Sequence, residues 1–119
     1  MPYLTREQIL KADDLPTEDV EVPEWGGVVR VRALTGAERD ALEAAVLDVR
    51  GKNVRVRLEN ARALIVAMSV VDEDGNRLFS DKDVKALGQK SAAALDRVAS
   101  VAMRLAGLTK EDLEELTKN

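Results

Sequence analysis

Apolar and polar side chains alternate along this chain with two different periods, and the changes between them predict its elements. Residues 18–22 and 28–33 alternate with a period of two, which predicts two half-buried strands. Residues 23–27 would join them as the loop of a β-hairpin. Acidic positions on the first strand would then lie beside arginines on the second, which favours the pairing.

Apolar residues at helical spacing predict three longer helices, at about residues 36–50, 54–68 and 92–106. The turn at 51–53 would join the first two into an antiparallel helical hairpin. Three shorter helices are expected at about residues 6–11, 81–87 and 110–117.

Several residue patterns mark where these helices begin and end. Thr5 with Gln8 and Thr35 with Glu38 fit the capping box, and Ser80 and Thr109 are weaker hydroxyl caps. Glycines after the last apolar positions are expected to end two helices, namely Gly88 and Gly107.

Residues 70–72 and 77–79 flank an Asp-Gly turn at 73–76, which predicts a second β-hairpin. Taken together, the elements predict an α+β fold that is predominantly α, with a helical core and two small β-hairpins. We expect one domain over residues 1–119.

The composition limits both the core and the chemistry. Aromatic residues make up 3% of the chain, so the core is expected to consist of valine, leucine, isoleucine and alanine. Such a core buries a modest area, and stability is expected to lean on contacts between copies. The chain has no histidine and no cysteine, which removes the commonest general base and the usual zinc ligands. We therefore expect no enzyme and no cofactor.

Two sequence patterns are candidates for a ligand site, and both fail on spacing. Gly26-Gly27 lacks the lysine and the helix start of a phosphate-binding loop. In a calcium loop that begins at Asp72, the glycine would be the sixth residue, but Gly75 is the fourth. We interpret this segment as a turn and expect no metal site.

The chain shows no sign of a membrane segment. No charged-then-apolar leader pattern begins it, and its longest apolar run, residues 63–71, is far shorter than the roughly 20 residues of a membrane span. We expect a cytosolic protein with no membrane partner.

Charge is distributed unevenly along the sequence. Residues 1–25 hold two basic and seven acidic side chains, whereas residues 26–62 hold eight basic and five acidic ones. These segments could pair within or between copies, although a solvated surface is the interpretation we favour. The candidate charged contacts are Arg30, Arg32, Arg55 and Arg57.

The basic segment 30–62 also suggests nucleic-acid binding. Phosphate binding needs clustered positive charge, but carboxylates are interleaved here and no aromatic residue for stacking lies in the segment. We expect no nucleic-acid partner, and we keep a small regulatory or nucleic-acid-binding protein as the alternative function.

Two groups of apolar residues are candidates for partner contacts. Trp25, at the tip of the first hairpin, either covers the core or anchors a partner. Leucines near the end of the chain either pack on their own domain, which we favour, or dock on a neighbour. They are Leu105, Leu108, Leu113 and Leu116.

Five stretches of the sequence carry a family resemblance. They run over residues 4–16, 20–27, 31–36, 71–80 and 91–98. With these stretches in this order, the chain resembles the small tail assembly chaperones of siphovirus-type bacteriophages and their prophages. The matching residues are mostly caps, strands and turns, so they indicate kinship and do not locate a site.

The resemblance implies a non-catalytic interaction protein. Its partner would be the tape measure protein, which it would keep soluble in the host cytoplasm until tail tube subunits polymerise around it. The resemblance also implies a homo-oligomer, a frameshift-extended version of the chain as a second partner, and absence from the mature virion.

Overall fold

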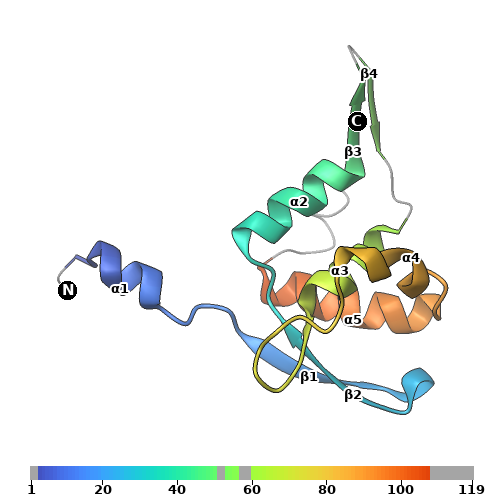
Figure 1. Ribbon diagram of the computed structural model, residues 1–119, viewed down its shortest axis with the longest axis horizontal. Coiled ribbons are helices and arrows are strands. Elements are labelled where there is room, and N and C mark those ends of the chain that lie inside the picture. Colours follow the sequence, from blue (N-terminus) through green and yellow to red (C-terminus); the bar gives the residue numbers. More distant parts are fainter. Residues whose placement is uncertain (1–2, 51–52, 57–59, 108–119) are drawn as a thin grey trace.

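The computed structural model describes residues 3–50, 53–56 and 60–107. A three-stranded antiparallel sheet lies along one side of a group of helices, as Figure 1 shows. A separate two-stranded hairpin projects from the body, and a short N-terminal helix stands apart from it (Figure 1).

The first predicted hairpin is confirmed. Strands β1 (Thr17–Val22) and β2 (Gly27–Arg32) pair in antiparallel register, with Val20 opposite Val29. A 3-10 turn, η1 (Pro23–Trp25), joins them. It ends at Gly26, whose φ of 74° lies in the left-handed region that a glycine adopts without strain. The backbone N–H of Gly26 donates to Pro23 O at 3.0 Å and closes the turn.

The second predicted hairpin forms differently. Strand β5 (Val70–Val71) pairs with β2, so the sheet order is β1-β2-β5. Across the Asp-Gly turn the chain forms one bridge, between Val71 and Arg77, with backbone hydrogen bonds from Asp72 N to Asn76 O at 2.8 Å and from Leu78 N to Val70 O at 3.1 Å. The strand therefore serves as the third member of the sheet.

Most of the predicted helices are confirmed. Their bounds are α1 (Arg6–Lys11), α2 (Gly36–Val46), α3 (Ala61–Ser69), η2 (Asp81–Asp83), α4 (Val84–Leu87) and α5 (Ala92–Leu105). The capping boxes form at Thr5 and Thr35, and Ser80 caps η2 in the same way. Gly107, with a φ of 79°, follows the end of α5. Thr109 and the helix expected at 110–117 lie outside the described residues.

The predicted helical hairpin of residues 36–68 is wrong in its middle. Strands β3 (Leu47–Arg50) and β4 (Asn53–Val56) replace the last turn of one predicted helix and the first of the other. The register sets Asp48 opposite Arg55. Valines at alternate positions favour a strand, and a short apolar run fits either period.

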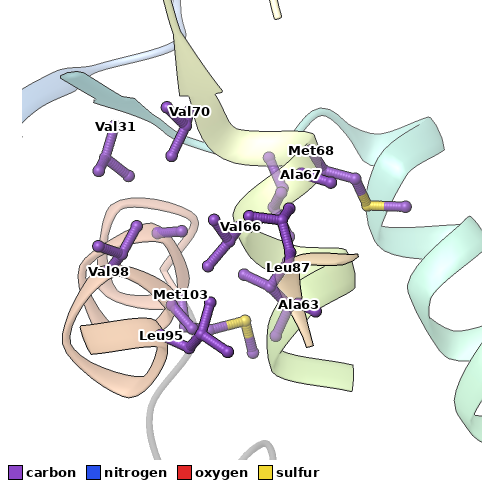
Figure 2. Packing of buried hydrophobic residues seen from close by; sticks show 14 of the residues in the cluster. Val31, Ala63, Val66, Ala67, Met68, Val70, Leu87, Leu95, Val98 and Met103 are labelled. Carbon is purple, nitrogen blue, oxygen red and sulfur yellow. The ribbon is translucent and has the colours of Figure 1, made fainter. Parts of the chain in front are cut away.

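The core lies between the sheet and the helices. Val98 and Leu95 of α5 point toward Val66 of α3, and Val31 and Val70 approach from the sheet (Figure 2). Helix α3 packs against α5, α2 and α4, while α5 also contacts β1 and β2. Strand residues are thus as deeply buried as helix residues, with Val22 and Val31 at 0% exposed.

This arrangement overturns the predicted fold class. An α+β fold that is predominantly α was expected to have a helical core decorated by two small hairpins. The described residues instead form a mixed fold, in which a three-stranded antiparallel sheet is one wall of the core. The physical reason is the pairing of β5 with β2, which joins the chain after α3 to a strand nearly forty residues earlier.

Two arginines hold the carboxyl end of α3 against the sheet. Arg32 Nη2 donates to Met68 O at 2.9 Å and to Glu38 Oε1 at 2.6 Å. Arg77 Nε donates to Ala67 O at 3.0 Å. The last carbonyls of a helix have no partner within it, and they carry partial negative charge. The two guanidinium groups supply the missing hydrogen-bond donors and place positive charge beside these carbonyls.

Replacing Arg32 by methionine is expected to destabilise the fold by about 3 kcal/mol, because it leaves the mostly buried carboxylate of Glu38 without its cation and the carbonyl of Met68 without its donor. The side chains of Arg32 and Glu38 are 17% and 14% exposed. Chemical denaturation of the wild type and of Arg32→Met measures the difference. The control is Arg39→Met, which breaks the more exposed pair of Arg39 with Glu43 and should cost less than about 0.5 kcal/mol. Equal losses in the two variants would contradict this role of Arg32.

Candidate interaction surfaces

The N-terminal arm, residues 3–16, is the most exposed part of the described chain. Helix α1 within it has no buried residue and stands away from the body (Figure 1). Its hydrogen bonds are local, such as Gln8 N to Thr5 Oγ1 at 3.2 Å. Large apolar side chains of the arm are 57–100% exposed, namely Tyr3, Leu4, Ile9 and Leu10.

A shallow hollow on the outer face of the sheet is the second exposed apolar feature. The residues that line it come from all three strands and the turn after β5, and they are Asp19, Val28, Arg30, Val71, Asp72 and Glu73. Val28 is 61% exposed and gives the hollow an apolar side. Asp19 and Arg30 form an ion pair at 3.3 Å, and their charges cancel. The carboxylates of Asp72 and Glu73 remain, and they make the rim of the hollow acidic.

The turn that carries Trp25 is fixed to α5. The guanidinium of Arg97 donates two hydrogen bonds to Glu24, at 2.6 and 3.0 Å. The hydrogen bond from Arg97 holds the pKa of Glu24 below its ordinary value of 4.5. Trp25 is half-buried and packs against the core. The structure thus places it where it covers the core, with part of its ring still in solvent.

A second arginine of α5 holds the other end of β1. Arg104 Nη2 lies 2.8 and 2.7 Å from the two carboxylate oxygens of Glu18. Together with Asp19 and Glu24, this gives three carboxylates of the acidic first quarter a partner within the chain. Two of the three cationic partners, Arg97 and Arg104, come from α5, and the third, Arg30, comes from the basic middle of the chain.

The arginines of the basic segment whose side chains the structure describes are paired with carboxylates, as Arg39 is with Glu43. Arg30 contacts Asp19, and Arg32 contacts Glu38. Arg62 of α3 reaches Asp96 of α5 at 3.1 Å. Arg55 lies on β4, and Arg57 is outside the described residues. These paired side chains do not form the uncancelled positive face that phosphate binding requires.

The leucines predicted near the end of the chain are described only in part. Leu105 is half-buried and packs against the core. Leu108, Leu113 and Leu116 lie outside the described residues. Of the four leucines, Leu105 therefore packs on its own domain.

The Asp-Gly turn has a structural use for its first carboxylate. Asp72 Oδ1 accepts hydrogen bonds from the N–H groups of Asp74 and Asn76, both at 2.9 Å. Among the residues that the structure describes, no group of acidic side chains is arranged to hold a metal ion. Within the same residues, no helix has the length and apolar character needed to cross a membrane.

The arm is the interaction feature that the sequence analysis missed. Its cap was recognised, but the apolar residues around the cap were not considered as a surface. The available signal was their number: Leu4 before the cap, with Ile9 and Leu10 in so short a helix, exceed what local packing can cover.

The sequence has relatives among known proteins. A family model described as phage tail assembly chaperone matches residues 6–119. The chain belongs to the phage tail assembly chaperone family. The family has a chaperone role without catalysis, so this tail assembly chaperone is not an enzyme.

A solved structure shares the fold of this chaperone. It is the tail assembly chaperone of bacteriophage HK97, with a TM-score of 0.61 and 22% sequence identity. The match covers 83% of this chain and 94% of the HK97 chain. No curated protein matches the sequence.

Acidification is expected to remove the stabilisation that Arg97 and Glu24 provide. Because the folded-state pKa of Glu24 is lowered, this contribution is present above the ordinary glutamate pKa of 4.5 and is lost as the pH falls through the folded value. The melting temperatures of the wild type and Glu24→Gln should differ at pH 7 and converge at pH 3. The control is Glu21→Gln, since Glu21 is exposed on β1. A Glu24→Gln difference that stays constant with pH would contradict the ion pair.

Proposed function

We propose that this tail assembly chaperone binds the tape measure protein of a siphovirus-type phage and keeps it soluble during tail assembly. The chaperone acts in the host cytoplasm and is absent from the mature virion. Residues 1–119 act as one domain. The chaperone self-associates, and a frameshift-extended version of the chain takes part in the same assemblies.

The observation that carries this proposal is the exposed apolar surface of the family member described here. Six large apolar side chains of the described residues are more than half exposed, and four of them lie on one arm. Large exposed apolar groups on a soluble domain indicate a surface that meets other proteins. A long helical protein before assembly exposes apolar faces of its own, which such a surface can cover.

The predicted contact residues keep their place in this proposal. Trp25 and Leu105 would offer a partner the parts of their side chains that the core leaves exposed. Leu108, Leu113 and Leu116 would act as a group. Among the charged candidates, Arg30 and Arg55 would contact a partner. Arg32 already donates a hydrogen bond to the end of α3. Arg57 is the residue that follows β4 in the sequence.

Co-expression with the tape measure protein of the same phage is expected to raise its soluble fraction. Without the chaperone, most of the tape measure protein should be in the pellet, because its apolar faces associate. The soluble fraction on a blot and pull-down through a tag on the chaperone measure the effect. The matched control is the Arg32→Met variant, whose weakened fold should give less rescue. A pellet fraction unchanged by the wild-type chaperone would refute the proposal.

Self-association is expected to persist in 1 M salt. Three carboxylates of the acidic quarter are already paired within the chain, so contacts between copies should be mainly apolar. The screening length falls to about 3 Å at 1 M, which weakens exposed charge pairs but not apolar contacts. Sedimentation velocity at low and high salt measures this. Dissociation on adding salt would show that charges hold the oligomer.

The same sedimentation experiment tests the last leucines. If Leu113 and Leu116 hold copies together, the Leu113→Ala/Leu116→Ala variant should sediment as a smaller species than the wild type. A variant of unchanged size would assign self-association to another surface.

A further inference from the structure

Within the residues that the structure describes, the N-terminal arm has a defined shape but buries none of its helix against the body. A six-residue helix is too short to be stable in water, because ordering the backbone of the first turn loses more free energy than its one hydrogen bond supplies. The capping box at Thr5 supports α1, but its side chains bury nothing. Among the described residues, the capping box is thus the main side-chain support that α1 has.

The apolar residues of the arm are in positions that make one surface. Leu4 precedes the N-cap residue and Ile9 is the fourth residue of α1, the two positions of a hydrophobic staple. Even so, Leu4 is 70% and Ile9 57% exposed, and Leu10 beside them is 66% exposed. The staple fixes the geometry of the surface and leaves it uncovered.

The hollow on the outer sheet face matches helix α1 in charge. Its exposed apolar side is Val28, Val71 at its base is 3% exposed, and Asp72 and Glu73 make its rim acidic. Helix α1 carries two cations and one anion in six residues, and its Arg6 is 77% exposed. An apolar helix with excess positive charge therefore fits an apolar hollow with excess negative charge.

The chain's own arm is directed away from this hollow. Pro16 O accepts a hydrogen bond from Ala33 N at 2.9 Å, so Pro16 continues β1 beside β2. Proline keeps the preceding Leu15 in an extended conformation. Residues 3–16 contain no glycine to reverse the chain, and the arm points away from the body (Figure 1). Another copy is free to present its arm in the required orientation.

We propose that residues 3–11 of one copy dock into the hollow on the outer sheet face of a second copy. The proposal rests on the self-association put forward above and names the surfaces that make it. Ile9 and Leu10 cover Val28, while Arg6 and Lys11 lie near Asp72 and Glu73. Docking completes α1 by burying the apolar face that is exposed in a single chain.

Disulfide trapping between two singly substituted chains tests the contact. The protein has no cysteine, so Ile9→Cys and Val28→Cys variants each carry one thiol. Mixed and oxidised, they should form a covalent heterodimer, because docking brings the two Cβ atoms within disulfide reach. The matched control pairs Ile9→Cys with Ser100→Cys, since Ser100 is exposed on α5, away from the hollow.

Three results would overturn the proposal. One is a heterodimer yield no higher than that of the Ser100→Cys control. Another is a rapid intramolecular bond in the Ile9→Cys/Val28→Cys double variant at high dilution, which would show that the arm docks on its own chain. The third is trapping that requires the tape measure protein, which would make that protein the occupant.

A second measurement does not depend on cysteine geometry. Ile9→Asp should raise the dissociation constant between copies by about tenfold or more, because it puts a charge into an apolar contact. Ala12→Asp adds the same charge after the end of α1 and should change the constant much less. If both variants associate like the wild type, the arm is not the contact, although self-association stands. A wild-type monomer would overturn both.

Discussion

The fold depends on the capture of the carboxyl end of α3 by two arginines from different parts of the chain. Arg32 comes from the end of β2 and Arg77 from the turn after β5, and they donate to the carbonyls of Met68 and Ala67. Glu38 of α2 also accepts from Arg32 and from the backbone of Thr35. One guanidinium therefore connects the sheet, α2 and α3. Because the helix leads directly into β5, this contact also holds the third strand in register with β2.

The division of the molecule into a body and an arm follows from this organisation. The sheet buries one face against α3 and α5, and arginines of α5 fasten both ends of the first hairpin through Glu18 and Glu24. These contacts pair two acidic side chains of the hairpin and involve no residue of α1. The outer sheet face and the arm remain exposed. They are the surfaces that we propose for contacts with other proteins.

Local patterns identified well those elements whose limits are set by nearby residues. The capping boxes at Thr5 and Thr35 depend on side chains three residues apart, and the structure contains both. Residues 47–56 were harder because Val49 and Val54 fit the stripes of the two predicted helices, while Leu47, Val49, Val54 and Val56 also fit the alternation of two strands. The choice depended on pairing between two segments, with Asp48 opposite Arg55, which no single segment reveals. The exposure of the arm was equally hidden, since it depends on what the body fails to cover.

The sequence by itself determined the capped starts of α1 and α2 at Thr5 and Thr35, the first hairpin, the absence of cysteine and histidine chemistry, and the family resemblance. Each of these follows from residue identity or from spacing within one segment. Only the tertiary structure decided that Val70 and Val71 join β2, that Arg97 and Arg104 neutralise Glu24 and Glu18, and that α1 is left without a partner. Those outcomes join residues far apart in the chain. Their energies arise when burial brings the groups together, so they are set by packing and not by local pattern.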